Sequence, residues 1–216
     1  RLFHWLLVGA VAGAVVTGLQ GGAMMDLHGR FGLSIVGLLC FRLTWGFFGS
    51  TYARFAQFLP TPSKLAAYTK GQWRGEGHNP LGALSVLILL ALLCAQVATG
   101  LISNDDIAFS GPLTNLVTAN VSNRMTGVHH LLANAIYVLV GLHIGAIAFY
   151  TRFKRQSLVR PMVTGWKQDA LGESARGGGI GAFAVAVALS ALAVYGASGI
   201  WLAPPPPPAA GETPNF

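Results

Sequence analysis

Five of the six histidines in this sequence lie inside strongly apolar segments. GVHHLLANAIYVLVGLHIGA, at positions 127–146, contains His129, His130 and His143, while RLFHWLLV at 1–8 contains His4 and DLHGRFGL at 26–33 contains His28. An ionisable side chain within a membrane-spanning segment is costly and is a functional candidate by default. The chemistry open to an imidazole in such a place is metal ligation or proton transfer.

Helical geometry separates the three histidines of segment 127–146. At about 100° per residue, His143 lies within about 40° of His129 but about 140° from His130. His129 and His143 therefore share one face and are separated by about 21 Å along the helix axis. In a hydrocarbon core about 30 Å thick, one would lie near each surface. His130 is expected to pack or to hydrogen-bond beside the site.

The four remaining histidines form two pairs when they are sorted by depth in the membrane. His4 begins its segment on the side where His143 lies, and His28 begins its segment on the side where His129 lies. Two pairs at two depths are what two bis-histidine haems require, since each iron takes one imidazole from each of two facing helices. Gly32, one turn after His28 on the same face, would leave room for a flat macrocycle.

Alternative roles for these residues stay open. The pairs Gly9/Gly13 and Gly141/Gly145 are accounted for equally well by close helix packing. A proton-coupled transporter could use a histidine relay, although such proteins usually also have intramembrane carboxylates and no span interior here contains Asp or Glu. A zinc or di-iron site is disfavoured because the sequence has no HExxH motif and the histidines differ too much in depth. A third alternative is a structural membrane anchor for a redox complex.

The composition indicates which elements position the histidines. Of the 216 residues, 53% are hydrophobic and 10% are charged, against about 25% charged in a soluble domain. Each of five stretches approaches or exceeds the roughly 20 residues that span a bilayer, and helices satisfy their own backbone in lipid. The predicted fold class is an all-α integral membrane helical bundle with five transmembrane helices. The predicted spans are about 2–19, 27–48, 80–102, 127–150 and 181–203, and the third starts at an N-cap, Asn79.

The distribution of basic residues predicts the orientation. The net charge is +7, but it is confined to particular loops, which favours membrane lipid over nucleic acid. One side of the bundle has only Arg30 and Arg124, and the other side, predicted to be cytoplasmic, has 12 of the 14 Lys and Arg residues. The N-terminus is then cytoplasmic and the C-terminus periplasmic. The 12 residues are Arg1, Arg42, Arg54, Lys64, Lys70, Arg74, Arg152, Lys154, Arg155, Arg160, Lys167 and Arg176.

Several longer motifs resemble those of the bacterial cytochrome b561 family, which includes the cytochrome b subunits of nickel–iron hydrogenases. Besides RLFHWLLV and DLHGRFGL, they are FRLTWGFFGSTYARFAQF at 41–58, GHNPLGALSVLILLALL at 77–93, TGLISNDDIAFSGPL at 99–113 and LVRPMVTGWK at 158–167. The resemblance implies two b haems held by His4, His28, His129 and His143, the four residues that the geometry selects. His130 falls where such proteins often have an acidic residue, so it receives no role.

The resemblance further implies electron transfer across the bacterial inner membrane. A haem iron with two histidine ligands has no open position and passes electrons only. The expected partners are the quinone pool, with ubiquinone or menaquinone near the inner haem, and a periplasmic c-type cytochrome, hydrogenase or other redox subunit. The chain is then a quinone-linked oxidoreductase or a subunit of one. Arg30, two residues from His28, is the first candidate to bind a haem propionate; further candidates are Arg124, Arg1, Arg42, Arg54 and Arg152.

The chain is expected to have three parts. As the resemblance implies, residues 1–167 form the four-helix dihaem core. Residues 168–203 form a glycine-rich linker and the fifth transmembrane helix, and 204–216 form a proline-rich periplasmic tail. The fifth helix is rich in Gly, Ala and Ser, which suits close helix contact. It is predicted to dock a partner subunit or a second copy, giving a homodimer or a larger complex; a plain lipid-facing anchor is the alternative. The five consecutive prolines of the tail favour a polyproline II rod or a disordered end.

Overall fold

The computed structural model describes residues 1–73, 79–105, 107, 109–166 and 177–203. Within these ranges the chain is a bundle of helices without strands, and five helices are long and apolar enough to cross a membrane. The predicted fold class, a helical membrane bundle, is thereby confirmed. The predicted linker and proline tail fall mainly on residues 167–176 and 204–216, which lie outside the described residues. The five long helices are α1 (Leu2–Gln20), α2 (Met25–Phe48), α5 (Pro80–Gly100), α6 (Ala119–Arg152) and α8 (Gly179–Ser198).

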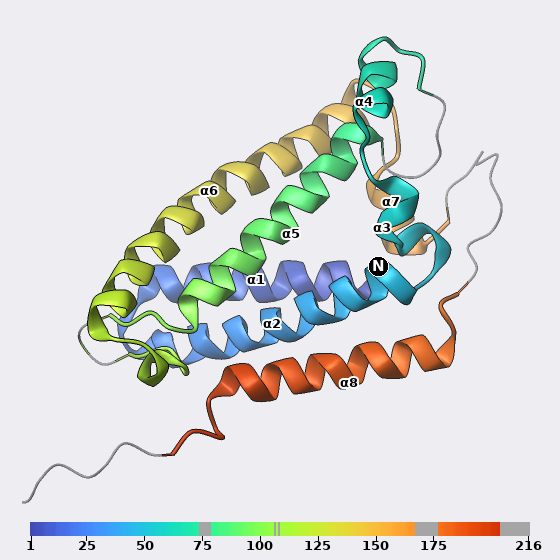
Figure 1. Ribbon diagram of the computed structural model, residues 1–216. Helices are drawn as coiled ribbons and strands as arrows, with labels where there is room; N and C mark the ends of the chain where they lie inside the picture. Colours follow the sequence, from blue (N-terminus) through green and yellow to red (C-terminus); the bar gives the residue numbers. More distant parts are fainter. Residues whose placement is uncertain (74–78, 106, 108, 167–176, 204–216) are drawn as a thin grey trace, which may run out of the picture.

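Short helices occupy the connections between the long ones. As Figure 1 shows, α3, α4 and α7 gather where α1, α5 and α8 begin and where α2 and α6 end. We call this the basic end, because Arg1, Arg42, Arg54 and Arg152 belong to it. The opposite end, where residues 101–118 join α5 to α6, is called the loop end. The short elements are α3 (Phe55–Phe58), α4 (Pro62–Thr69), α7 (Val159–Thr164) and the 3-10 turns η1 (Gly22–Met24), η2 (Thr51–Ala53) and η3 (Thr114–Leu116).

Local capping sets the helix boundaries, including two that hydropathy misplaced. Asn79 caps α5 as predicted, since its side chain accepts a hydrogen bond from the backbone N–H of Gly82. Helix α6 begins at Ala119, eight residues before the predicted start, because the Thr118 side chain caps it ahead of its polar first turns. Helix α8 ends at Ser198, short of the predicted 203, because Gly199 adopts the left-handed conformation (φ 67°) that terminates helices.

The helices pack in two pairs that share one core. Helix α1 lies along α2 and α5 lies along α6, while a smaller contact between α2 and α5 joins the pairs. Most other apolar side chains face outward, as expected where lipid is the solvent; the side chains of Leu131 and Leu142 on α6 are 68% and 63% exposed. The buried core draws on all four helices and consists of Ala10, Ile35, Leu39, Leu90, Leu93 and Ile136.

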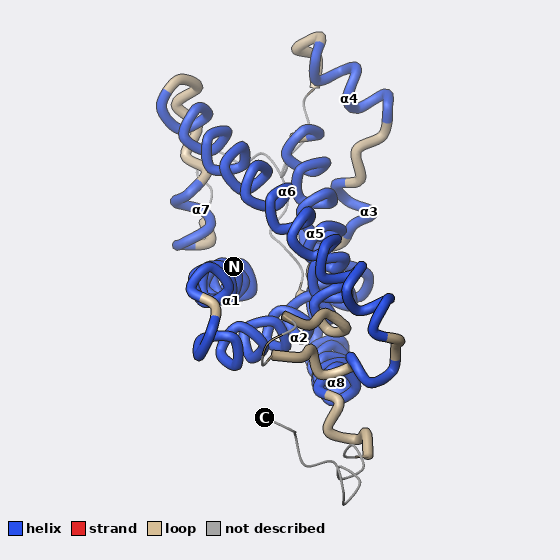
Figure 2. Tube along the Cα trace, turned by 90° about the vertical axis from the view of Figure 1, so that its left-hand side faces the viewer, coloured by secondary structure: helices blue, strands red, loops and turns tan. Residues whose placement is uncertain are grey.

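Helix α8 packs along α2, on the side opposite α1 (Figure 2). Small residues allow this close approach: Ala186 is fully buried, and a Cβ atom at Gly37 would lie 2.9 Å from Val194. Phe183 adds an edge contact to the ring of Trp45. The fifth helix therefore belongs to the same bundle, and its docking to a partner subunit or a second copy stays a prediction about its outward face.

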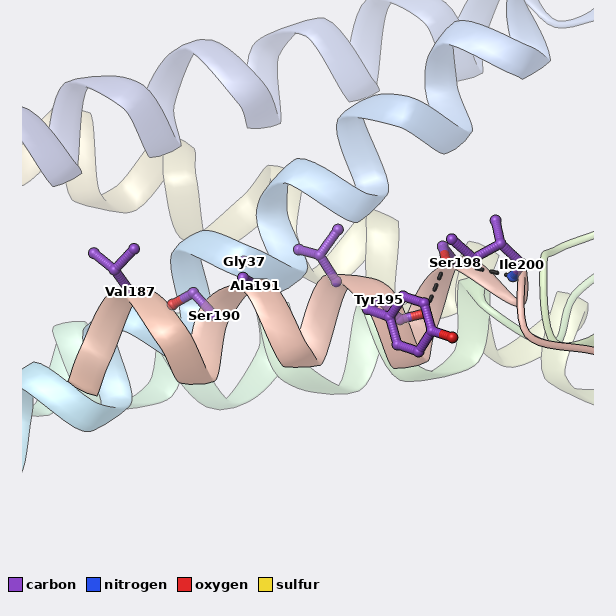
Figure 3. Close-up of a pocket in the computed structure, with 8 residues that line it drawn as sticks. Gly37, Val187, Ser190, Ala191, Tyr195, Ser198 and Ile200 are labelled. Carbon is purple, nitrogen blue, oxygen red and sulfur yellow. Dashed lines mark hydrogen bonds between the residues drawn. The ribbon is translucent and has the colours of Figure 1, made fainter. Parts of the chain in front are cut away.

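A shallow groove of about 530 Å³ lies between α2 and α8 (Figure 3). Its two serines, Ser190 and Ser198, donate to carbonyl oxygens of their own helix, at Ala186 and Tyr195. These serine hydroxyls are therefore already engaged, and the rest of the lining is almost entirely apolar. The lining consists of Gly37, Val187, Ser190, Ala191, Val194, Tyr195, Ser198 and Ile200.

Candidate functional site

The structure brings His28 and His129 together at the loop end. Their ring centroids are 6.1 Å apart and their planes are inclined by 84°. His28 lies in the first turns of α2, directly after a reversal of the chain that depends on positive φ at Gly21 (63°) and Gly22 (52°). Glycine adopts such values without the steric cost that other residues incur. The tight reversal places the start of α2 against the end of α1.

His28 is held by a carbonyl group of the neighbouring helix. Its Nδ1 lies 2.8 Å from the backbone oxygen of Ala14 on α1. A carbonyl oxygen can only accept, so Nδ1 carries the proton and Nε2 of the neutral ring keeps its lone pair. Gly18 makes room for the ring, because a Cβ atom there would lie 2.9 Å from His28 Nδ1. The histidine is thus fixed in position and in tautomer by α1.

His129 has an equivalent support on α5. Its Nδ1 donates to the backbone oxygen of Gln96 at 3.0 Å and lies 3.3 Å from Oγ1 of Thr99. Its Nε2 accepts from the side-chain amide of Gln96 at 3.0 Å. A Cβ atom at Gly100 would lie 2.8 Å from Cε1 of the ring, so only glycine allows this approach. The two loop-end imidazoles therefore have the same tautomer.

The two histidines at the basic end have surroundings unlike those of the loop-end pair. His4 on α1 and His143 on α6 are both half-buried. Nδ1 of His4 is buried and has no hydrogen-bond partner. The next residue, Trp5, donates its indole N–H to the Met162 carbonyl of α7 at 3.2 Å, and its ring lies edge-on to His4. The α1 start is therefore anchored, while the His4 ring itself is not.

The glycines singled out in the sequence differ in what surrounds them: one contacts a neighbouring helix and the others face open space. A Cβ atom at Gly13 would clash with the ring of Phe31 on α2, which supports helix packing at that position. A Cβ atom at Gly9, Gly141 or Gly145 would meet nothing within 4 Å. Helix packing therefore does not explain why these three positions are glycine. Gly32 also faces open space, as a residue beside a flat prosthetic group should.

The remaining sequence candidates have more ordinary surroundings. Arg30 is exposed on α2, two residues beyond His28. His130 is exposed on α6, and its ring lies edge-on to that of His129 with the centroids 6.4 Å apart. The guanidinium of Arg42 lies 4.8 Å from the centroid of the Phe55 ring and donates to the Ala53 carbonyl at 3.0 Å. Arg54 donates to the Gly49 carbonyl at 2.9 Å. These two arginines thus have a structural role in the connection after α2.

Sequence reasoning missed the polar residues that support the loop-end pair. Gln96 and Thr99 are the polar side chains in an otherwise apolar stretch of α5, and that isolation was the available signal. Asp105 was also missed: its Oδ1 accepts the backbone N–H groups of Ile107 and Phe109, at 3.0 Å and 2.8 Å. This turn sets the Phe109 ring against Gly29, one residue from His28.

Comparison with known protein families identifies a match over most of the chain. The family model described as prokaryotic cytochrome b561 matches residues 1–165, which is more than half of the chain. This range contains α1 to α7 and all four histidines of the two pairs. No curated protein and no solved structure shows significant similarity to the chain.

Proposed function

The chain belongs to the prokaryotic cytochrome b561 family and is therefore an integral membrane b-type cytochrome of electron transfer; from this premise we propose how its histidines serve that role. His28 and His129 hold one b haem at the loop end, and His4 and His143 hold a second at the basic end. Electrons pass through both haems between a periplasmic redox partner and the quinone pool. Residues 1–167 form the haem-binding unit.

The loop-end pair supports this proposal most directly. Two metal–imidazole bonds of about 2 Å, together with the radii of both rings, separate ring centroids by roughly 6 Å, and the rings of His28 and His129 are 6.1 Å apart. Both rings donate from Nδ1 to a backbone carbonyl, so Nε2, which on His129 accepts from the Gln96 amide, keeps the lone pair that would bind iron. Histidine ligands of metals usually have such a partner on the second nitrogen, because it fixes the tautomer and raises ligand basicity.

A different observation supports a second haem site at the basic end. A buried polar atom without a partner costs about 1–3 kcal/mol, and Nδ1 of His4 is such an atom. His143 lies on α6, on the same face as His129 and about 21 Å along the helix from it, toward the basic end. The two pairs thus lie at two depths of the same bundle. Each haem iron, held by two imidazoles, supplies one-electron chemistry and offers no position to a substrate.

The surroundings of the two ends suggest the partners. The excess of Lys and Arg supports a cytoplasmic location of the basic end in the bacterial inner membrane. The quinone, ubiquinone or menaquinone, exchanges electrons there, and a c-type cytochrome or another redox subunit does so at the loop end. The exposed guanidinium of Arg30, two residues from His28, would bind a haem propionate at the loop end.

The test is a haem count on single variants of the purified full-length protein. Wild type should contain two b haems per chain, and His129→Ala and His143→Ala should each retain one, with different low-spin signals in electron paramagnetic resonance. His130→Ala is the matched control and should retain both. Wild type without haem, or a His129→Ala protein that keeps both haems and both signals, would overturn the assignment.

A further inference from the structure

Gln96 contacts both ring nitrogens of His129, although its helix α5 contains no histidine. Its backbone carbonyl accepts from Nδ1 and its side-chain amide donates to Nε2, each at 3.0 Å. A carbonyl oxygen only accepts and an amide NH2 group only donates. The two bonds together are therefore compatible with one state of the ring, in which the proton is on Nδ1 and the lone pair is on Nε2.

The orientation of the Gln96 amide is determined by this contact. The reverse orientation would set the amide oxygen against the Nε2 lone pair, so that two acceptors faced each other. In the observed orientation, Oε1 is buried and has no hydrogen-bond partner. A buried oxygen without a partner is costly. The Gln96 side chain therefore donates to the histidine although its own oxygen is left without a hydrogen bond.

The neighbouring residues of α5 restrict the ring further. Thr99 Oγ1 donates to carbonyls of its own helix and lies 3.3 Å from Nδ1 of His129. The Cα of Gly100 lies under the ring, where any side chain would clash. The ring of His129 is therefore confined by one turn of α5 that itself provides no metal ligand.

We propose that Gln96 is a positioning residue for the loop-end haem: it keeps His129 in the tautomer that binds iron, and its amide holds Nε2 by a hydrogen bond that iron replaces. The inference rests on the proposed function, because it takes His129 as an iron ligand. It adds that a residue outside the ligand set fixes how the ring of His129 is oriented for binding iron.

Two substitutions at this position should have opposite effects. Gln96→Glu keeps the size of the side chain but puts an acceptor against Nε2, so a proton is held on the atom that iron must bind. Gln96→Leu removes the amide and leaves the backbone carbonyl that fixes Nδ1. Gln57→Leu, on α3 at the basic end, is the matched control. A role in filling space alone would make the isosteric Glu the milder change.

The measurements are made on full-length protein from cells with ample and with limited haem supply. Gln96→Glu should lose the loop-end haem and its low-spin signal, while the basic-end haem reports that the bundle is folded. Gln96→Leu should keep both haems, and at limited supply its ratio of loop-end to basic-end haem should exceed that of wild type by about two- to tenfold, the effect of one hydrogen bond. Gln57→Leu should match wild type.

The outcomes separate this inference from the proposed function. A Gln96→Glu protein with both haems, or a Gln96→Leu ratio equal to or below that of wild type, would overturn the role of Gln96 and leave the haem assignment intact. If Gln96→Glu lost both haems, the Gln96→Leu ratio alone would decide. Wild type without haem would overturn the proposed function first.

Discussion

The two ends of the bundle support the same residue type in different ways. At the loop end, His28 and His129 each donate to a carbonyl of a neighbouring helix and each lies against a glycine. At the basic end, His4 has a buried nitrogen without a partner, and its helix is anchored through Trp5 instead. The loop-end rings are thus oriented before any cofactor binds, whereas at the basic end we propose that the cofactor completes the site.

The largest effect is expected for a substitution at the glycine that contacts a loop-end histidine ring. Gly100→Val should abolish haem binding at the loop end, because even a Cβ atom would lie 2.8 Å from His129 Cε1. The basic-end haem should remain, giving half the wild-type haem content. Gly181→Val, on α8, is the control, since its Cβ meets nothing within 4 Å and both haems should persist. Full haem content in Gly100→Val would show that the ring is less confined than the contacts indicate.

A second test compares the two midpoint potentials. Donation from Nδ1 to a carbonyl makes the imidazole a stronger donor and stabilises ferric iron, while the basic loops favour reduction of the nearer haem. The loop-end haem should therefore have the lower potential. About 1 kcal/mol, typical of one hydrogen bond, corresponds to roughly 40 mV for one electron. Redox titration of His143→Ala and His129→Ala assigns each value, and equal or inverted potentials would contradict the comparison.

A smaller effect, on local stability, is expected in the turn at Asp105 at the loop end. Asp105→Ala removes the acceptor of two backbone N–H groups that hold Phe109 over Gly29. Losing these bonds should cost about 1–2 kcal/mol of local stability. Hydrogen exchange at the amides of Ile107 and Phe109 should accelerate by about tenfold for each 1.4 kcal/mol. Asp26→Ala, at the exposed start of α2, should leave both rates unchanged.

The smallest effect is expected at the basic end. The Tyr68 and Tyr150 hydroxyls share a hydrogen bond that joins α4 to α6. Burial, and then this bond, raise the pKa of Tyr68 to about 12. The contribution of the bond is thus present below the ordinary tyrosine pKa of about 10 and is lost as the pH rises through the folded value. Tyr68→Phe should remove the late-titrating tyrosine from an ultraviolet titration while both haems stay; an unchanged titration would contradict the assignment.

The sequence was sufficient for features that depend on one helix at a time. The five spans follow from hydropathy, and the shared face of His129 and His143 follows from helical periodicity. The start of α6 was wrong because its first turns are polar and depend on the Thr118 cap. The contacts of Gln96 with His129 and of Ala14 with His28 could not be predicted, because they depend on how two helices are placed against each other. Gly13 and Gly141 look alike in the sequence, and only packing separates them.

The long helices are buried to different extents, which has a consequence for electron transfer to other proteins in the membrane. Helix α2 lies between α1 and α8, whereas α6 has the smallest buried share of the five long helices. A neighbouring membrane protein that approached from the α8 side would be two helices away from the proposed iron centres. One that approached α6 would be separated from both by a single helix, and tunnelling favours the thinner barrier.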